Sequence, residues 1–272
     1  MKVAAAKVAA AKVLVKLGGA LLDTPEMRQS MARQIAEARA RGVELVVVHG
    51  GGKQMTRYLA ERGIESRFVD GLRVTTPQTI DAVLKVFAGS VNHELVASVN
   101  RAGAPAVGLT GIDAFLAEAE QMDPALGAVG RVTRCNAALL NLLVGNGYVP
   151  VVACVAGDRA GNIYNVNADQ MAVACAAGFG ASQLVFLTDV EGVLDASRQI
   201  RRSLTAAESR QLIADGVATG GMQAKLNAAL SALMAGVEQV RIAPGAAENA
   251  LARALAGEEI GTRMVLREEQ AA

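Results

Sequence analysis

The sequence is poor in aromatic residues, histidine and cysteine, and each shortage excludes something. It has no tryptophan and only 3% of its 272 residues are aromatic, so aliphatic side chains must build the core. The two histidines, His49 and His93, argue against a histidine-based metal site. The three cysteines lack Cys-x-x-Cys spacing and are odd in number, which favours buried free thiols in a reducing compartment; they are Cys135, Cys154 and Cys175.

An excess of charge of either sign is also missing, as is any long apolar run. Lys and Arg number 27 against 26 Asp and Glu, a net charge of +1, which indicates neither a nucleic-acid-binding surface nor an acidic tail. No apolar run reaches the length that crosses a membrane, and no signal-peptide pattern is found at the N-terminus. We therefore expect a cytoplasmic protein that binds neither nucleic acid nor membrane. Its 272 residues fit one two-lobed domain or two small ones.

Two short apolar runs in the first part of the chain end in consecutive glycines. Residues 13–22, VLVKLGGALL, carry Lys16 ahead of Gly18 and Gly19, and residues 43–52, VELVVVHGGG, end in three glycines. A lysine inside a buried strand needs a facing charge, and glycines leave backbone N–H groups uncovered, so the first run predicts an anion site. The alternative is an edge strand whose lysine extends to water before a plain turn. Because a right-handed β–α–β unit brings both strand ends to one sheet edge, we expect the two turns to form one site.

Strands and helices alternate along the rest of the chain. We expect a helix between Thr24 and Gly42, a short hairpin that turns at Gly71 with two helices behind it, an irregular segment over 117–128, and a glycine turn at 220–221. This alternation predicts an α/β fold with a mostly parallel sheet. The first twelve residues repeat a VAAAK unit, which is typical of a short helical arm or a tail.

The common phosphate-binding and kinase motifs are missing. The only Gly-Lys step, Gly52–Lys53, has Val47 and Gln54 where a P-loop requires glycine and serine or threonine. No GxGxxG dinucleotide motif occurs, and neither do the HRD, DFG or GxSxG motifs. A phosphate site built on these glycine turns must therefore be assembled in another way.

Six short motifs nevertheless occur in a recognisable order and spacing. They are KLGG at 16–19, VVHGGG at 47–52, GLRVT at 71–75, NVNAD at 165–169, LTDVEGV at 187–193 and ATGGMQAKL at 218–226. Together they resemble the amino-acid kinase family, in the branch that phosphorylates N-acetyl-L-glutamate, over about residues 13–265. Each motif alone is weak, but six in register are highly specific. The resemblance implies a three-layer αβα sandwich of the carbamate-kinase type around a central, mostly parallel sheet.

The resemblance also implies a reaction. ATP would phosphorylate the side-chain carboxylate of N-acetyl-L-glutamate to N-acetyl-L-glutamyl 5-phosphate, the second step of arginine biosynthesis, with Mg²⁺ held mainly through the ATP phosphates. A general base is not needed, because the attacking carboxylate is already ionised at neutral pH. The chain would form a single domain, 1–272. It would consist of an arm at 1–12, a substrate-binding and dimerisation lobe at 13–178 and a nucleotide-binding lobe at 179–272.

Matching the motifs implies a role for each site residue. Lys16 and Lys225 would neutralise the phosphoryl oxygens, and Asp169 would stand between the two ammonium groups. Arg73 and Asn165 would bind the α-carboxylate of the acid, for which the planar fork of arginine is suited. Backbone amides for phosphate and substrate would come from Gly18, Gly19, Gly51 and Gly52. The nucleotide cleft would be lined by Asp189, Val190, Glu191, Gly192, Val193, Leu194, Val217, Ala218 and Thr219. No residue is assigned to a metal.

Several of these residues also have a purely structural interpretation. Asp169 can be the N-terminal residue of a helix, with NVNAD as its capping turn. Arg73 can be an exposed hairpin charge, and Lys225 can lie on the solvated face of a helix. His49 receives no chemical role, and His93 is expected on a helix surface. The six motifs together favour the functional interpretation.

Two rival functions remain. A sister kinase acting on an acetylated or carrier-linked aminoadipate differs by one methylene, which discriminates by only ~1–3 kcal/mol. A non-catalytic nucleotide- or amino-acid-sensing module would be expected to lose one of Lys16, Asp169 or Lys225, and all three are present.

Residues 1–12 are shorter and plainer than the N-terminal helix that interlaces arginine-inhibited hexamers of this family. We therefore expect a homodimer that arginine does not inhibit. Met-Gln-Ala at 222–224 departs from the family's frequent Met-Ile-Pro.

Overall fold

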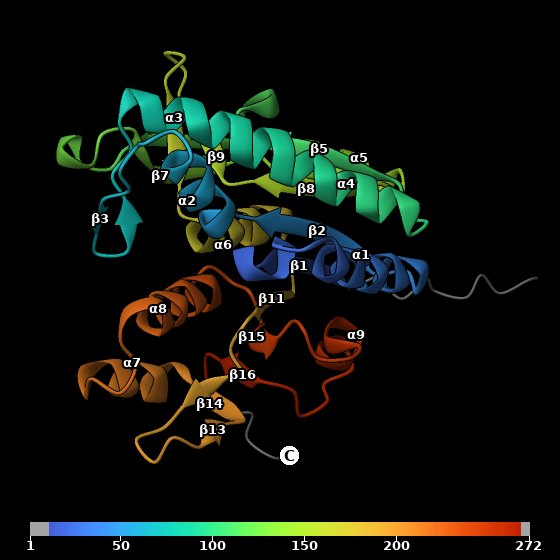
Figure 1. Ribbon diagram of the computed structural model, residues 1–272. Coiled ribbons are helices and arrows are strands. Elements are labelled where there is room, and N and C mark those ends of the chain that lie inside the picture. The colour runs from blue at the N-terminus through green and yellow to red at the C-terminus, as the bar shows by residue number, and fades with distance from the viewer. Residues whose placement is uncertain (1–10, 268–272) are drawn as a thin grey trace, which may run out of the picture.

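An eight-stranded sheet lies at the centre of the computed structural model, which describes residues 11–267 (Figure 1). In spatial order its strands are β14 (Ser203–Thr205), β16 (Thr262–Val265), β15 (Gln239–Pro244), β11 (Gln183–Thr188), β1 (Lys12–Leu17), β2 (Glu44–His49), β8 (Val149–Ala153) and β5 (Ala106–Thr110). β16 runs antiparallel to β15, and the other neighbours in this sheet are parallel. The predicted α/β fold with a mostly parallel sheet is confirmed. Of the arm predicted at 1–12, residues 1–10 lie outside the described residues.

Helices cover both faces of this sheet and complete three layers. One face carries α1 (Pro25–Ala40), α4 (Asn92–Arg101) and α9 (Ala250–Leu255), and the other carries α5 (Ala138–Gly145), α6 (Ala168–Phe179) and α8 (Gly220–Met234). Aliphatic side chains of the strands and of these helices form the buried core, as the composition predicts. The αβα sandwich is therefore confirmed. In the stretch 11–267, none of the helices combines the length and apolarity that crossing a membrane requires.

The helix ends follow the sequence signals in part. Thr24 caps α1 by accepting a hydrogen bond from the Met27 amide at 3.3 Å, and Thr205 and Glu208 form a capping box on α7 (Ala206–Ala214). The glycine turn predicted at 220–221 is wrong, because α8 begins at Gly220. Thr219 is extended there and Gly220 has a φ of +53°, so the glycine makes the entry into the helix.

The two helices predicted behind the Gly71 hairpin are in fact one continuous helical run. It consists of α3 (Pro77–Val83), the π-helical segment η2 (Leu84–Val91) and α4. The hairpin itself is confirmed: β3 (Phe68–Val69) pairs antiparallel with β4 (Leu72–Arg73), and Gly71 has a φ of +78°. A second hairpin joins β12 (Val193–Leu194) to β13 (Ile200–Arg201), and α2 (Gly52–Ala60) follows β2 directly.

The segment predicted to be irregular, 117–128, is mostly ordered. It holds β6 (Ala117–Gln121) and the short η4 (Pro124–Leu126), and β6 closes a small barrel with β7 (Val129–Cys135), β9 (Val155–Gly157) and β10 (Ile163–Val166). Ala117 and Ala119 are buried there while Glu120 is exposed. This alternation of small apolar and acidic residues was the strand signal that the sequence interpretation missed.

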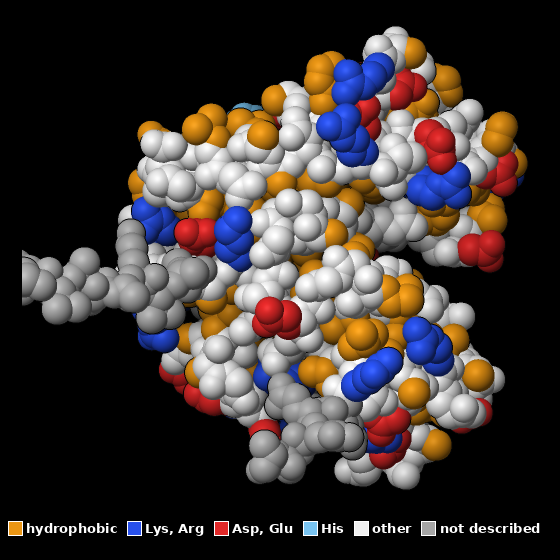
Figure 2. Space-filling view, turned by 180° about the vertical axis from the view of Figure 1, so that it is seen from behind, with side chains coloured by type: hydrophobic (Ala, Val, Ile, Leu, Met, Phe, Trp, Pro, Cys, Tyr) orange, Lys and Arg blue, Asp and Glu red, His pale blue; other side chains and the backbone are white. Residues whose placement is uncertain are grey.

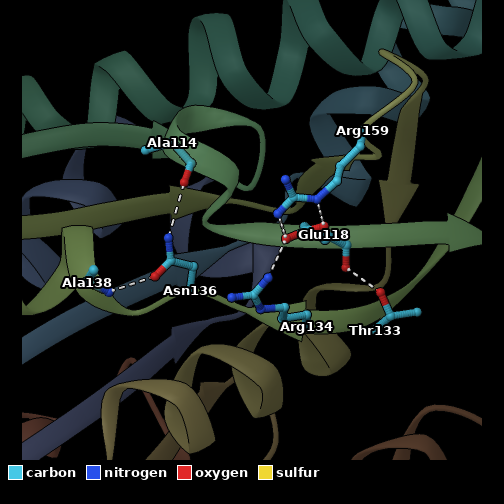
Figure 3. A network of polar contacts seen from close by, with 7 residues as sticks. All are labelled: Ala114, Glu118, Thr133, Arg134, Asn136, Ala138 and Arg159. Atoms are coloured by element: carbon cyan, nitrogen blue, oxygen red, sulfur yellow. Dashed lines mark hydrogen bonds and ion pairs between the residues drawn. The ribbon is translucent and has the colours of Figure 1, made fainter.

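A polar network ties this barrel together at its surface (Figure 3). Arg159 donates two hydrogen bonds of 2.8 Å to the carboxylate of Glu118, and Arg134 donates a third of 3.2 Å. Nearby, the Asn136 side chain accepts from the Ala138 amide and donates to the Ala114 carbonyl, which joins β7 to the start of α5. The Arg159 hydrogen bonds hold the pKa of Glu118 below its usual value. The barrel so fixed carries β10 up to the start of α6, which forms part of the site below.

Candidate active site

The two glycine turns meet at the carboxyl ends of β1 and β2, as predicted. A Cβ on Gly19 would lie 3.3 Å from the Gly52 amide nitrogen, so the two backbones are in close approach. Gly19 begins the short η1 (Gly19–Leu22) and Gly52 begins α2, and an amide at the first helical position has no acceptor inside its helix. Gly18 departs from the prediction. Its amide donates to the Leu187 carbonyl of β11 at 2.8 Å, so it serves the sheet and is not available to phosphate.

Lys16 and Asp169 form the central ion pair of the site. Lys16 Nζ lies 2.7 Å from Asp169 Oδ1, and each side chain is 10% exposed. Lys16 comes from the middle strand β1, while Asp169 lies in the first turn of α6, where Asn167 accepts hydrogen bonds from the Asp169 and Gln170 amides. The capping interpretation of NVNAD is therefore confirmed, and the carboxylate in the capped turn also faces Lys16. The lysine has the facing charge that its burial requires.

A cavity of ≈ 630 Å³ opens beside this pair. The predicted site residues that line it are Lys16, Gly18, Gly19, Gly52, Arg73, Asp189 and Lys225. Figure 2 shows the surface hollowed between the two halves of the molecule, and in Figure 1 helix α8, which carries Lys225, lies across from α2. The fold thus brings together two lysines that are far apart in the chain. Lys225 is half-buried at the edge of this cavity, where the prediction from the motifs places it.

The predicted bridging role of Asp169 is only half fulfilled. Asp169 contacts Lys16, but within the described part of the chain it makes no ion pair with Lys225. α6 packs on both β1 and α8, but the Asp169 side chain meets Lys16 of β1, while Lys225 of α8 lines the cavity. Asp169 also lines a neighbouring hollow of ≈ 600 Å³ between α6 and α8, together with Ala224.

Arg73 is a buried cation surrounded by neutral groups. It is 8% exposed, and its guanidinium donates to Thr56 Oγ1 at 2.8 Å, to the Gly52 carbonyl at 3.2 Å and to Ser66 Oγ, with the Phe68 ring centroid 4.6 Å away. Burial lowers the pKa of Arg73 from its usual value, although arginine stays charged. Among residues 11–267 no carboxylate lies within 4.0 Å of it. The exposed-hairpin interpretation is therefore wrong, and the site lacks an anion for this cation.

Asn165 and Gly51 lie behind the cavity wall. The Asn165 side chain donates to Thr75 Oγ1 at 3.0 Å, and that hydroxyl donates to the Arg73 carbonyl at 2.8 Å, so the predicted partners Arg73 and Asn165 are joined through Thr75. Gly51 is buried, and a Cβ there would lie 2.9 Å from the Phe87 ring. Neither residue is among those that line the cavity.

Of the predicted nucleotide-cleft residues, Asp189 alone lines this cavity. The others stand on the turn after β11, on the following strand β12, and on the loop before α8. Gly192 has a φ of +155° and packs on Thr262, whose Oγ1 accepts from the Val193 amide at 2.8 Å. Val193 and Ala218 are buried. These positions shape the two loops, and their side chains are available to a ligand only in part.

Several lining residues were not predicted from the sequence; they are Ala20, Asp23, Lys53, Thr56, Arg57, Phe68 and Thr188. Lys53 and Arg57 are four residues apart, on one face of α2, a spacing that could have marked them as additional cations. Arg57 is partly neutralised by Asp23 at 2.6 Å. With these residues the cavity holds more cationic than anionic side chains, so its field favours a polyanion.

The two histidines and the three cysteines differ in how deeply they are buried. His93 is exposed, as expected, whereas His49 is fully buried and its pKa is lowered to about 4 by burial. All the cysteines lie in the described part of the chain and are free thiols, and Cys154 and Cys175 are buried. Burial raises the pKa of Cys154 to about 12, so this thiol beside Lys16 and Asp169 stays protonated.

The fold and this site together define a class, an αβα protein with a cationic cavity at the carboxyl ends of its parallel strands and no P-loop. The sequence profile described as "Amino acid kinase family" matches residues 11–244. The chain belongs to the amino acid kinase family.

Named relatives lie close to this chain. It is 77% identical over 254 residues to the acetylglutamate kinase of Solibacter usitatus, covering 93% of this chain and 99% of the relative. The acetylglutamate kinase of Rhizobium johnstonii is 41% identical over 267 residues, which cover 93% of this chain and 90% of the relative.

Solved structures show the same fold at lower identity. N-acetylglutamate synthase of Neisseria gonorrhoeae, complexed with coenzyme A and N-acetyl-glutamate, has a TM-score of 0.85 at 24% identity. That match covers 96% of this chain and 60% of the synthase. Carbamate kinase of Giardia has a TM-score of 0.69 at 17% identity, with coverage of 94% and 99%.

Proposed function

We propose that this chain transfers the γ-phosphoryl group of ATP to the side-chain carboxylate of N-acetyl-L-glutamate, in the second step of arginine biosynthesis. The product is N-acetyl-L-glutamyl 5-phosphate. The observation that carries the proposal is the 77% identity to an acetylglutamate kinase along 99% of that relative. The cavity supports it independently, because it combines cations and helix-start amides at the carboxyl ends of parallel strands.

The residues account for the chemistry without a general base. The acceptor carboxylate is ionised at neutral pH and attacks directly. Negative charge spreads over the transferred phosphoryl group, and Lys16 and Lys225 neutralise it from β1 and α8. Asp169 holds the Lys16 ammonium at 2.7 Å, which fixes where that charge stands. We assign Lys16, Lys225 and Asp169 as the catalytic group.

Arg73 is proposed to bind the α-carboxylate of the acid. It is a buried guanidinium whose described partners are all neutral, and a carboxylate would complete its set of acceptors. Asn165 is proposed to support Arg73 in this role through Thr75, whose hydroxyl joins the two residues. The amides of Gly19, Gly51 and Gly52 are the proposed donors to phosphate and substrate oxygens.

The donor set also fits MgATP. Lysine, arginine and amide groups suit phosphate oxygens, and within residues 11–267 no group of three or more His, Cys, Asp or Glu is placed to hold a metal ion. We therefore assign Mg²⁺ to the ATP phosphates and water, as its few protein ligands allow. Residues 179–272, with Asp189 and the 217–219 loop, form the proposed nucleotide-binding lobe, and residues 13–178 the acid-binding lobe.

A hydroxamate assay, which traps acyl phosphates, tests the activity. N-acetyl-L-glutamate, acetylaminoadipate, glutamate and aspartate are compared in parallel with ATP and Mg²⁺. Signal with N-acetyl-L-glutamate is expected to exceed that with the other acids. A larger signal with acetylaminoadipate would favour the sister kinase, and no signal with any acid would favour the non-catalytic module. Neither alternative is favoured by the named relatives.

We also propose that the chain is a homodimer that arginine does not inhibit. Leu142 in the middle of α5 and Tyr148, just after that helix, are 61% and 43% exposed, and such apolar side chains favour association. Light scattering with and without arginine should give the mass of two chains in both conditions. A mass of six chains would contradict the proposal.

A further inference from the structure

His49 lies directly below the second glycine turn and takes no part in the chemistry above. Its ring is fully buried at the end of β2. Nδ1 lies 2.8 Å from the Gly50 carbonyl oxygen, and Nε2 lies 3.0 Å from Nδ2 of Asn92, the first residue of α4. The same Asn92 nitrogen lies 2.9 Å from the Val151 carbonyl in β8. A short polar chain thus runs through the apolar core, from the sheet to the glycine turn.

Two backbone carbonyls fix every donor and acceptor in this chain of contacts. The Val151 carbonyl can only accept, so the nitrogen of the Asn92 amide must face it. That nitrogen then offers its second hydrogen to His49, so Nε2 accepts and the ring is the neutral Nδ1–H tautomer. Nδ1–H in turn donates to the Gly50 carbonyl. The orientation of the Gly50 carbonyl is therefore set by contacts that begin on the neighbouring strand, β8.

Fixing this carbonyl also fixes an amide of the site. In a planar trans peptide the C=O and N–H groups point in opposite directions. The Gly50 carbonyl faces the imidazole, so the Gly51 N–H of the same peptide points away from the imidazole. The Gly51 carbonyl accepts from the Met55 amide at 2.8 Å inside α2, so the Gly52 N–H likewise points out of the helix start. Both peptide planes before α2 are held by their carbonyls.

The π-helical segment η2 packs on the same turn from the other side. A Cβ added to Gly51 would lie 2.9 Å from Phe87 and 3.3 Å from Val91, and Asn92 follows immediately. The π-helical segment thus supplies the apolar wall of the turn, and the first residue of the helix that continues it, α4, supplies the amide that orients His49. π-Helical turns are often found at functional sites.

We propose that His49 and Asn92 are positioning residues for phosphoryl transfer, which hold the Gly50–Gly51 peptide so that the amides of Gly51 and Gly52 face the reacting groups. The proposal rests on the function proposed above. His49 touches no substrate in this scheme and exchanges no proton. It acts through the backbone, and its loss leaves the cations of the cavity in place while the glycine amides become free to turn.

Two substitutions of different geometry separate positioning from packing. The side-chain nitrogen of asparagine lies near the place of Nδ1, so His49→Asn keeps the donor to Gly50 but leaves a gap beside Asn92. His49→Gln is closer in size to histidine and keeps a group near the place of Nε2, but loses the donor to Gly50. If His49 positions the peptide, His49→Asn should have a higher kcat than His49→Gln, but a lower melting temperature. Packing alone predicts that both quantities are higher in His49→Gln.

The measurements are kcat and KM for both substrates in the hydroxamate assay, with melting followed by circular dichroism. We expect His49→Gln to lose about 10²-fold in kcat, as when one amide donor to a developing charge is lost, with KM changed only a few-fold. His49→Asn should stay within about tenfold of the parent kcat, the loss left by an imperfectly oriented group. His93→Gln, at the exposed histidine one residue beyond Asn92, is the matched control and should leave all values unchanged.

The possible outcomes are distinct. Equal kcat values in the two His49 variants, or a higher kcat in His49→Gln, would overturn the positioning role. If the parent protein forms no acyl phosphate, the proposed function fails first, and calorimetry with N-acetyl-L-glutamate then decides the inference. In that case, weaker binding of N-acetyl-L-glutamate to His49→Gln than to His49→Asn supports the inference that His49 holds the glycine amides in place. Equal binding to the two variants overturns that inference.

Discussion

Lowering the pH should destabilise the protein through one buried side chain, His49. Burial lowers its pKa to about 4 from the ordinary 6.5, because the charged form cannot be solvated. Between these values the native ring stays neutral, while the unfolded chain takes up a proton. The contribution to stability is therefore complete above pH 6.5 and is lost as the pH falls toward 4.

The size of the effect follows from the two pKa values. A difference between 6.5 and about 4 corresponds to a limit of about 3 kcal/mol in the free energy of unfolding. Between pH 7 and pH 5 the loss should be about 2 kcal/mol, and below pH 4 both states carry the proton and the loss ends. The contacts explain why the native ring resists protonation. Nδ1 already donates to Gly50, and a hydrogen on Nε2 would face the amide hydrogens of Asn92.

Urea unfolding followed by circular dichroism at pH 7, 6 and 5 measures this loss. His49→Gln does not titrate in this range, so its stability should fall by about 2 kcal/mol less than that of the parent protein. All other groups titrate alike in both proteins, so the difference between their pH-dependent losses of stability is due to His49 alone. His93→Gln is the control and should keep the pH dependence of the parent. Identical slopes for the parent and His49→Gln would refute the reasoning.

Three further substitutions test the site and its surroundings. Asp169→Asn leaves the Lys16 ammonium without a counter-charge; it should lower kcat at least 10²-fold, and urea unfolding should show a destabilisation of about 3–5 kcal/mol. An unchanged kcat would remove Asp169 from the catalytic group. Arg73→Lys loses the planar fork that reaches Thr56 and Gly52 together, so KM for N-acetyl-L-glutamate should rise more than about tenfold while KM for ATP changes little. Equal rises in both would contradict a role specific to the acid. Glu118→Gln, in the exposed network of Figure 3, should leave kcat and both KM values unchanged, and a fall in kcat would show that the barrel communicates with the site.

Which features could be predicted depended on whether their signal was local. Alternating strands and helices, the Thr24 cap and the Gly71 turn are set by neighbouring residues, and all are present as predicted. The turn predicted at Gly220 and the break predicted within 77–101 were also local inferences, but they failed. Tertiary packing extended both helical segments beyond the boundaries that propensity suggested.

In the site, too, local features could be predicted from the sequence and contacts between distant residues could not. Lys16 inside an apolar strand required a counter-charge, and the sequence alone predicted that one must exist. That Asp169 supplies it through α6, without also pairing with Lys225, depends on where α6 and α8 pack against the sheet. The sequence could not show that the Gly18 amide is taken up by β11, because strand register decides which carbonyl lies opposite.

By itself, the sequence determined the α/β class, the two glycine turns at one sheet edge and, through six ordered motifs, the family. These depend on the residues' own chemistry and on their order along the chain. Only the tertiary structure decided that Arg73 is buried without a carboxylate and that His49, given no role from sequence, is linked to the glycine turn through Asn92. The physical reason is that partners distant in the chain are chosen by packing and register. Local periodicity carries no information about such choices.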